Sequence, residues 1–280
     1  MIVRMFFPVA IGGIGGSGTR LIAKILMDCG YFLGSDRNKA DDNLWFSLLF
    51  RRVETYSLGQ SDVDTFSGIF TKAMHGGSVF STSEELIVQD LARHARPPHS
   101  VAWLEERKTT LLATSATANP SPWGWKEPNT HIVVDRLLAT MPDLKYIHLV
   151  RNGLDMAYSD NQNQLKLWGK QFFPDGFEVS PFWSLRFWHV ANLRVIDFFE
   201  RRPNQFLLLN FDRLCVDPER ELARLLAFID VPATRKAISR LAKLPQRPES
   251  TGRFKQFSLD AFDSDDVRFV EHLGFDCQLP

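Results

Sequence analysis

The sequence predicts an α/β protein: a central, mainly parallel sheet with helices on both faces and a phosphate-binding loop after the first strand. Two observations carry this prediction. Near the N-terminus, a mostly apolar run enters a glycine-rich segment and then an amphipathic helix. In the middle of the chain, a second apolar strand leads directly into an arginine and another helix. Strands that alternate with helices are typical of parallel sheets, whose ligands bind beyond the carboxyl ends of the strands.

The N-terminal element combines a strand, a glycine-rich loop and a helix. A mostly apolar run at residues 5–11 enters GGIGGSGTR at residues 12–20, and the helix that follows has its apolar positions on one face. Glycines let a backbone approach a phosphate closely, while the free N–H groups and positive end of a helix N-terminus attract it. We therefore predict a P-loop-like phosphate site. The residues expected to bind there are Gly15, Gly16, Ser17, Gly18, Thr19 and Arg20.

Two well-known nucleotide motifs can be compared with this loop. Residues 13–18 satisfy the GxGxxG pattern of dinucleotide-binding proteins, and Asp36 stands at roughly the spacing of the acid that binds a ribose hydroxyl. A mononucleotide P-loop would continue with lysine and then serine or threonine, but Thr19 and Arg20 stand there. The loop therefore disfavours an ATPase and leaves a dinucleotide-binding protein open.

The second element is YIHLVRNGLDMAYS at residues 146–159. Its apolar start predicts a buried strand that ends at Arg151, Asn152 can cap the next helix, and Asp155 suits the first helical turn. Ser159 is expected two turns into that helix, roughly 10–12 Å along its axis at about 1.5 Å per residue. A long arginine and a serine hydroxyl could then hold one anion from two sides, so we predict a phosphate clamp.

Together these segments resemble the sulfotransferases that use 3′-phosphoadenylyl sulfate (PAPS). Residues 17–20, Ser-Gly-Thr-Arg, look like the family's loop for the 5′-phosphosulfate, and residues 151–159 are similar to its 3′-phosphate motif. Residues 207–231 resemble the strand, acidic turn and helix that complete the family's domain. The resemblance implies PAPS as sulfuryl donor, a hydroxyl or amine acceptor and no metal. It also implies that Arg253, in a basic glycine-containing loop at residues 247–257, returns to the 3′-phosphate.

The same resemblance indicates which cation acts in catalysis. Many family members place a lysine or arginine just before the Ser-Gly-Thr, where it neutralises the sulfate and the leaving oxygen, but this chain has Gly16 there. Residues 123–131, WGWKEPNTH, are similar to an aromatic segment that in several branches carries a lysine into the active site. This similarity implies Lys126 as the catalytic cation, with Arg20 as the second candidate.

A general base is also expected, because the acceptor must lose a proton. In the family this base is a histidine or a carboxylate. Residues 30–38 fall where the protein-tyrosine branch has its carboxylate-bearing segment, which implies Asp36 as the base. Three other residues stay open as alternatives: Asp42, Glu127 and His131.

The remaining segments are read from spacing and composition. Residues 43–52, 84–96 and 184–199 have the apolar spacing of helices. Residues 57–83 and 97–122 are rich in Gly, Ser, Thr and Pro, and we expect irregular insertions that could build an acceptor pocket.

Length and composition fit one domain that spans residues 1–280. Lys plus Arg and Asp plus Glu both number 33, so no global basic field points to nucleic acid. No segment reaches the roughly 18 consecutive apolar residues of a membrane span. Three widely spaced cysteines fit neither a disulfide framework nor a zinc site and favour a reducing compartment, so we expect a cytoplasmic protein. These are Cys29, Cys215 and Cys277.

Two other functions remain alternatives to sulfuryl transfer. An NAD-dependent oxidoreductase would explain the GxGxxG pattern and Asp36, but it would leave the clamp of Arg151 and Ser159 unexplained. A non-catalytic nucleotide-binding protein would explain both phosphate sites if no base is present. The sequence leaves the acceptor open among a small molecule, a lipid, a carbohydrate and a peptide.

Overall fold

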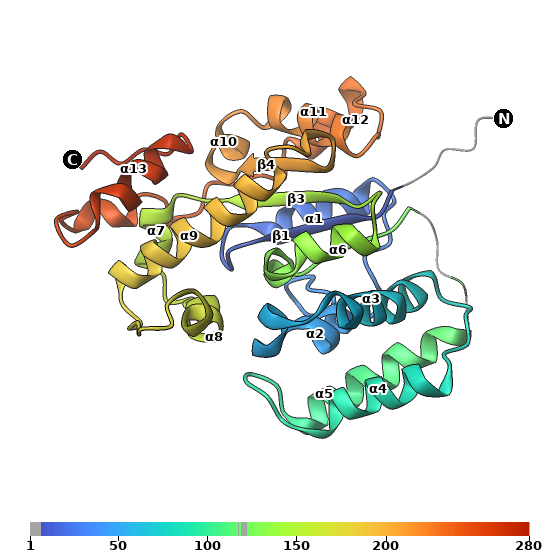
Figure 1. The fold of residues 1–280 in the computed structure, drawn as a ribbon. Helices are drawn as coiled ribbons and strands as arrows, with labels where there is room; N and C mark the ends of the chain where they lie inside the picture. The colour runs from blue at the N-terminus through green and yellow to red at the C-terminus, as the bar shows by residue number, and fades with distance from the viewer. Residues whose placement is uncertain (1–6, 117, 119–121, 280) are drawn as a thin grey trace. The chain divides into compact units, whose positions relative to one another are not determined.

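A computed structural model describes residues 7–116, 118 and 122–279 (Figure 1). It contains a four-stranded parallel sheet, which confirms the predicted fold class. The strand order is β2-β1-β3-β4, with β1 at Val9–Gly13, β2 at Gly124–Lys126, β3 at Lys145–Val150 and β4 at Phe206–Asn210. Of the predicted first strand, Met5 and Phe6 lie outside the described residues.

The chain divides into two compact units. Of the described residues, unit 1 holds 7–11 and 22–146, and unit 2 holds 12–21 and 147–279. The divisions fall inside β1, inside the first helix and inside β3. These three elements therefore have residues in both units. The glycine loop belongs to unit 2, whereas Lys126 and Asp36 belong to unit 1.

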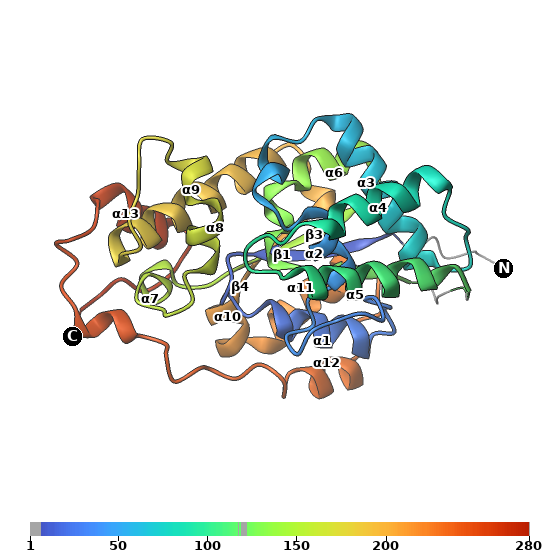
Figure 2. The ribbon, with the colours of Figure 1, turned by 90° about the horizontal axis from the view of Figure 1, so that it is seen from below.

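Unit 1 is built on the parallel pair of β1 and β2, in which Ile11 pairs with Lys126. Figure 2 shows α1 and α6 on opposite sides of β1. The helices that lie wholly or mostly in unit 1 are α1 (Thr19–Asp28), α2 (Leu44–Phe50), α3 (Gln60–His75), α4 (Thr82–Arg93), α5 (Val101–Leu112) and α6 (Val134–Thr140). Three short 3-10 helices accompany them: η1 (Val53–Ser57), η2 (Ala113–Ala116) and η3 (Pro128–Ile132).

Aromatic side chains attach α2 and α3 to the sheet in unit 1. The ring of Phe46 from α2 stacks on Trp125 of β2 at 5.5 Å, and Phe70 from α3 meets Trp125 edge-on at 5.2 Å. All three side chains are buried. Such pairs add geometric preference to the burial of a large apolar area, so they fix α2 and α3 against β2.

The predicted irregular insertions at residues 57–83 and 97–122 were wrong, because they contain α3 and α5. Two of their serines cap helices: Ser81 forms a capping box with Glu84 at α4, and Ser100 accepts a hydrogen bond from the N–H of Trp103 at α5. Gly68 faces open space within α3. The many small polar residues of these segments therefore led to a prediction of irregular structure where two helices with mostly apolar buried faces are found. Of residues 97–122, positions 117 and 119–121 lie outside the described part.

Unit 2 contains β4, most of β3 and the C-terminal helices. The strand and helix predicted at 207–231 and the core helix predicted at 184–199 are confirmed by β4, α11 and α9. The helices are α7 (Gly153–Ala157), α8 (Asn163–Phe172), α9 (Pro181–Phe199), α10 (Phe211–Val216), α11 (Pro218–Phe228), α12 (Arg235–Leu241) and α13 (Ser264–His272). Two short 3-10 helices are η4 (Pro203–Gln205) and η5 (Arg253–Gln256).

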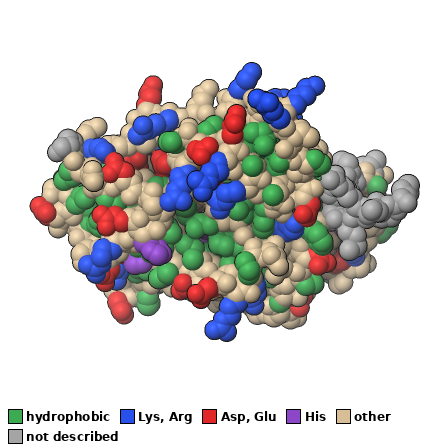
Figure 3. Space-filling model, turned by 90° about the horizontal axis from the view of Figure 1, so that it is seen from above, with side chains coloured by type: hydrophobic (Ala, Val, Ile, Leu, Met, Phe, Trp, Pro, Cys, Tyr) green, Lys and Arg blue, Asp and Glu red, His purple; other side chains and the backbone are tan. Residues whose placement is uncertain are grey.

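Charged side chains of both signs are interspersed on the surface. Figure 3 shows Lys and Arg beside Asp and Glu over one face of the molecule, as the equal totals of 33 and 33 lead one to expect. Among the described residues, none of the helices has both the length and the apolar character needed to cross a membrane.

A buried histidine lies in the core of unit 2. His148 of β3 is fully buried, and its Nε2 donates to Oδ1 of Asn192 on α9 at 2.8 Å. The Asn192 amide in turn donates to the carbonyl oxygen of Trp188 at 2.7 Å. Burial lowers the pKa of His148 to about 4, an effect that the bond to Asn192 only partly opposes. The folded protein therefore keeps this imidazole neutral.

This histidine makes the stability of the protein depend on pH. The unfolded chain takes up the proton near pH 6.5 and the folded chain near pH 4, so the free energy of unfolding should fall as pH drops between these values. The loss is about 1.4 kcal/mol per pH unit for one proton. Urea unfolding at a series of pH values from 7 to 4.5 measures this loss. In His148→Gln, the slope of the free energy of unfolding against pH should decrease by the amount that corresponds to about one proton. An unchanged slope in His148→Gln would contradict the burial of a neutral imidazole.

Candidate functional site

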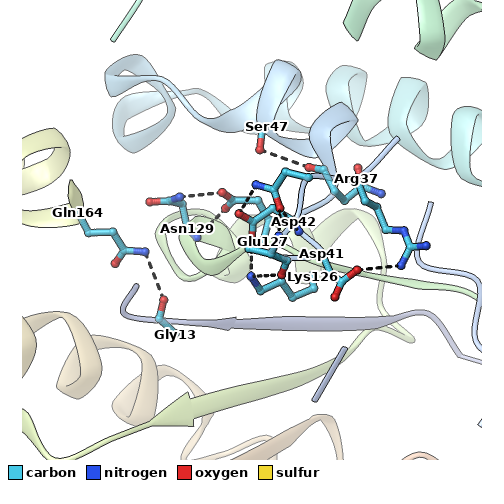
Figure 4. Close-up of polar contacts among 12 residues, drawn as sticks. Gly13, Arg37, Asp41, Asp42, Ser47, Lys126, Glu127, Asn129 and Gln164 are labelled. Atoms are coloured by element: carbon cyan, nitrogen blue, oxygen red, sulfur yellow. Dashed lines mark hydrogen bonds and ion pairs between the residues drawn. The ribbon is translucent and has the colours of Figure 1, made fainter. Parts of the chain in front are cut away.

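The glycine loop joins β1 to α1 within unit 2. β1 ends at Gly13 and α1 begins at Thr19, as the sequence predicts. The loop turns where the N–H of Ser17 donates to the carbonyl oxygen of Ile14 at 3.1 Å. The side chain of Gln164 on α8 donates to the carbonyl oxygen of Gly13 at 3.3 Å and so holds the start of the loop (Figure 4).

Two glycines let the loop lie against its neighbours without a side chain between them. Gly13 has φ +144°, and a Cβ there would lie 2.4 Å from the carbonyl oxygen of Leu149 on β3. Gly18 has φ +95°, and a Cβ there would lie 2.4 Å from the ring of Phe211 on α10. Both positions combine a backbone conformation that favours glycine with a contact that excludes any other residue. The loop is therefore pressed between β3 and α10.

The polar groups of the loop are placed to bind an anion. Ser17 is fully buried, and in the described part of the chain its Oγ has no hydrogen-bond partner. Thr19 is buried at the start of α1, while Gly16 and Arg20 are exposed. A buried hydroxyl without a partner costs free energy, so its position at a helix N-terminus fits the binding of an external phosphate or sulfate oxygen.

Arg151 leaves the carboxyl end of β3 in the same unit. Its NH2 group donates to the hydroxyl of Ser250 at 2.7 Å, while its buried Nε has no partner among the described residues. Its guanidinium carbon lies 5.8 Å from the centre of the Phe211 ring. Phe211 therefore contacts both Gly18 of the loop and Arg151, so the two predicted anion sites share one neighbour.

Arg253 joins Arg151 through Ser250. Its Nε donates to the carbonyl oxygen of Ser250 at 3.2 Å, and its NH1 donates to the carbonyl oxygen of Tyr158 at 3.2 Å. The structure thus brings together two arginines that the sequence separates by about a hundred residues. The sequence analysis missed Ser250, although its place in the Ser-Thr-Gly-Arg run before Arg253 was a signal.

A carboxylate from α7 fixes the segment that carries Arg253. Asp155 is buried, and its two oxygens accept hydrogen bonds from the N–H of Gly252 at 2.8 Å and from the N–H of Phe254 at 3.3 Å. The residue that the sequence placed in the first turn of a helix therefore has a long-range partner as well. Asp155 positions Arg253 without itself carrying a free charge toward a ligand.

The predicted position of Ser159 was wrong. α7 ends at Ala157, so Ser159 lies beyond the helix and not two turns into it. Its Oγ accepts from the N–H of Asn161 at 3.2 Å, and the amide of Gln162 donates to its carbonyl oxygen at 2.7 Å. Serine and asparagine offer such local bonds in place of helical ones, which is the reason why the helix stops. Ser159 nevertheless follows Tyr158, whose carbonyl oxygen binds Arg253.

A pocket of about 330 Å³ opens in unit 2 alongside this segment. The neighbours of the two arginines line it, including Asn152, Asp212 and Gly252. Asp212 accepts a hydrogen bond from the N–H of Asn152 at 3.2 Å, and burial raises its pKa despite the nearby charges of Arg151 and Arg247. The residues on either side of Arg253 therefore border this pocket, while Arg253 itself does not line it.

Lys126 is a buried lysine of unit 1. Its exposed fraction is 3%, its Nζ forms an ion pair with Asp42, and it donates to the carbonyl oxygen of Ala40 at 3.1 Å (Figure 4). The register of the sheet places it beside Ile11, the last residue before the chain enters Gly12. A carboxylate therefore holds Lys126 in one position, whereas a lysine surrounded by water would be mobile.

The other candidate bases of unit 1 differ in their surroundings. Asp36 forms an ion pair with Nε of Arg107 at 3.0 Å and accepts a hydrogen bond from the hydroxyl of Thr110, both on α5. Glu127 is buried beside Lys126 and accepts from the N–H of Asn129 at 2.6 Å; burial raises its pKa, and Arg51 opposes this most strongly. The fourth candidate, also fully buried, is His131 on η3.

Comparison with known proteins identifies the family of the chain. A model of the sulfotransferase family matches residues 8–235, which include the glycine loop and Arg151. The chain belongs to the sulfotransferase family. No curated protein sequence gives a significant match.

Three solved sulfotransferase structures are similar to the chain. The sulfotransferase domain of the Synechococcus PCC 7002 olefin synthase is 13% identical with a TM-score of 0.49, and 98% of each chain is covered. A sulfotransferase from Alicyclobacillus acidocaldarius is 13% identical with a TM-score of 0.48, and 96% of each chain is covered. One from Mycobacterium avium is 14% identical with a TM-score of 0.48, covering 97% of this chain and 77% of that one. At these scores, no residue role is transferred from them.

The contacts of the loop predict different tolerances for its glycines. Gly13→Ala places a Cβ 2.4 Å from a backbone oxygen in a conformation that disfavours alanine, so we expect a loss of more than about 3 kcal/mol in the free energy of unfolding. Gly15→Ala is the matched control, because the nearest atom lies at an ordinary 3.6 Å, and it should change stability by less than about 1 kcal/mol. Urea unfolding measures both. Equal stability of the two variants would show that β3 does not constrain the loop.

Proposed function

We propose that the protein transfers a sulfuryl group from PAPS to a hydroxyl or amine acceptor. One observation carries this proposal: unit 2 combines the glycine loop and its unpartnered Ser17 hydroxyl with the cluster of Arg151, Ser250 and Arg253. These are two anion sites that share Phe211 as a neighbour. A donor with one phosphate group at each end of a nucleoside needs two such sites, and the family assignment supports sulfuryl transfer.

Each anion site has its own residues in this proposal. The 5′-phosphosulfate is bound by the loop, whose N–H groups, hydroxyls and arginine come from Gly15, Gly16, Ser17, Gly18, Thr19 and Arg20. The 3′-phosphate is bound by Arg151, Ser159 and Arg253. PAPS supplies the sulfuryl group, and the two arginines orient it through charge-assisted hydrogen bonds.

Lys126 is proposed as the cation that acts in turnover. Many sulfotransferases have a lysine or arginine at the position where this chain has Gly16. Another residue must therefore stabilise the charge that develops on the leaving oxygen. A buried lysine held by a carboxylate is preorganised for this role, because it needs no reorientation as charge develops.

The contacts favour Asp42 over Asp36 as the general base. Each carboxylate is bound to one cation and one hydrogen-bond donor: Asp36 to Arg107 and Thr110, and Asp42 to Lys126 and Asn38. The difference is that the cation bound to Asp42 is the proposed catalytic one. The base takes the proton that the acceptor hydroxyl or amine loses as its bond to sulfur forms, the bond to the bridging oxygen breaks and 3′,5′-ADP leaves. We expect Asp36 to act mainly in holding α5 to its neighbouring loop.

The nucleotide site leads to a binding prediction. Because two arginines can bind a 3′-phosphate, 3′,5′-ADP should bind more tightly than 5′-AMP by at least about 1.5 kcal/mol, the contribution of one charge-assisted contact. Arg151→Ala should abolish this preference, while Arg201→Ala, an exposed arginine of the same unit, should retain it. Isothermal titration calorimetry of the wild type and the two variants with each nucleotide measures all six combinations of protein and ligand.

The same assay tests the alternatives. If Arg151→Ala discriminates between the two nucleotides as well as the wild type does, Arg151 is not the 3′-phosphate ligand. Thermal stabilisation by NAD at concentrations where 3′,5′-ADP gives none would favour the oxidoreductase. Tight 3′,5′-ADP binding without transfer to any acceptor would leave a non-catalytic nucleotide-binding protein.

Kinetics separate the catalytic residues from the binding residues. Lys126→Ala and Asp42→Asn should each lower kcat by on the order of 10²-fold or more with little change in 3′,5′-ADP affinity, as expected for groups that act in the transition state. Asp36→Asn should instead lower the melting temperature and leave kcat within a few-fold. Near-normal turnover in Lys126→Ala would transfer the role to Arg20. A normal rate in Asp42→Asn with a reduced rate in Asp36→Asn would restore Asp36 as the base.

A further inference from the structure

Unit 1 contains a group of three arginines and one histidine that the proposed function does not use. Arg51 and Arg52 follow α2, and Arg96 and His99 lie in the turn between α4 and α5. In each of the four side chains, one buried nitrogen has no hydrogen-bond partner in the described part of the chain: Nε of the three arginines and Nε2 of His99. We call these four residues the cationic cluster.

The backbone and neighbouring groups hold the cationic cluster together. Arg96 donates to the carbonyl oxygen of Leu91 at 2.8 Å and to that of Leu48 on α2. Its N–H donates to the carbonyl oxygen of His99 at 2.9 Å, and the ring of His99 stacks on Trp103 at 3.8 Å. These contacts hold Arg96 and His99 in place near the end of α2.

The members of the cluster repel one another. Burial, together with the charges of Arg51 and Arg96, lowers the pKa of His99 to about 4. Burial and the charge of Arg52 lower the pKa of Arg96 to about 10. An anion bound beside these groups would favour their charged forms and so oppose both shifts.

Four acids act on the cluster without pairing directly with it. Among the described residues, none forms an ion pair with the three arginines or His99, although several act over a longer distance. Glu54 faces Arg52 and Arg96, and Glu127 faces Arg51. The other two acids, which face Arg52, are Asp62 and Asp90.

Capping of α2 explains only part of this arrangement. Arg96 binds the carbonyl oxygen of Leu48, and cations are favourable at the C-terminus of a helix. This accounts for the terminal nitrogens of Arg96. It does not account for the Nε atoms, for the side chain of Arg51 or for His99, all of which keep buried nitrogens without acceptors. Leaving charged donors unsatisfied is costly, so an external anion is the physically consistent partner.

We propose that the cationic cluster binds an anionic group of the acceptor, so that the acceptor is a hydroxyl or amine compound that also carries a carboxylate or a phosphate. This proposal rests on the proposed function. Arg51 links the cluster to the buried charges of the same unit, because its charge acts on Glu127, which adjoins Lys126. The anion site and the proposed catalytic pair of Lys126 and Asp42 are thus parts of one unit.

The first test uses inorganic sulfate and a local readout. The ring C–H signals of His99, assigned with His99→Gln, are followed by NMR while sulfate replaces chloride at constant ionic strength. Sulfate bound beside His99 should raise its pKa and shift its signals saturably. Arg51→Gln should weaken the effect about tenfold or more, as expected for the loss of a charge-assisted contact. Identical titrations in sulfate and chloride would overturn the proposal.

Two variants show that the effect is local. Arg93→Gln removes the same charge from an exposed position on α4, and it should leave the sulfate response intact. Arg151→Ala, which disables the proposed nucleotide site, should also leave it intact. Loss of the response in Arg151→Ala would show that the sulfate effect originates at the nucleotide site and would overturn the proposal.

The second test identifies the anion with the acceptor. 4-Hydroxybenzoate and 4-hydroxyphenyl phosphate are compared with the neutral, similarly shaped 4-hydroxybenzamide, both as competitors of sulfate at His99 and as acceptors from PAPS. The anionic probes should be preferred, and Arg51→Gln should remove the preference through KM with kcat retained. Equal use of the amide would overturn the acceptor assignment. Absence of 3′,5′-ADP binding would refute the proposed function but leave the sulfate response at His99 to be judged separately.

Discussion

Two contacts that only glycine permits set the position of the nucleotide loop. At Gly13 the loop touches the backbone of β3, and at Gly18 it touches the ring of Phe211. Neither contact contributes a hydrogen bond or a charge. Both nevertheless determine where the buried hydroxyl of Ser17 and the start of α1 are placed, because a side chain at either position would push the loop outward. The anion chemistry of unit 2 therefore depends on the absence of two side chains.

Around this loop, the charged part of the site is assembled from distant segments. Arg151 comes from the end of β3, and Arg253 comes from a segment about a hundred residues later. Ser250 accepts from Arg151 through its hydroxyl and from Arg253 through its carbonyl oxygen, which keeps two like charges close without a carboxylate between them. Such a pair of guanidinium groups is stable only with strong hydrogen-bond acceptors nearby, and a phosphate is one.

The sequence predicted those features that depend on neighbouring residues. Apolar spacing located β1, β3 and the helix α9, and the side chain of Asn152 caps α7 as expected. One local hydrogen bond was not foreseen. The hydroxyl of Ser159 accepts from the N–H of Asn161, and the predicted helix ends before this serine. The serine that caps α5 and the small polar residues within α3 were read as signs of irregular structure, so both helices were missed.

Contacts across long separations could not be read from the sequence. Nothing near Lys126 in the chain indicates that Asp42 would be its partner, and nothing near Asp36 indicates Arg107. The order of preference between Asp36 and Asp42 as base changes once these pairings are known. The cationic cluster is equally invisible in the sequence, since two of its members follow α2 and two lie beyond α4.

The double hydrogen bond of Asp155 has a consequence for how such a chain can vary. Because one carboxylate grips the backbone at Gly252 and Phe254, the location of Arg253 is independent of the length of the chain on either side. Residues could be inserted or deleted between α12 and this segment, or between η5 and α13, and the arginine would still return to the same place. Surface loops accept such changes at a small entropic cost. The tether itself uses only backbone amides, but both positions are constrained in other ways, because Gly252 has a φ of +81° that favours glycine and the side chain of Phe254 is buried in the core.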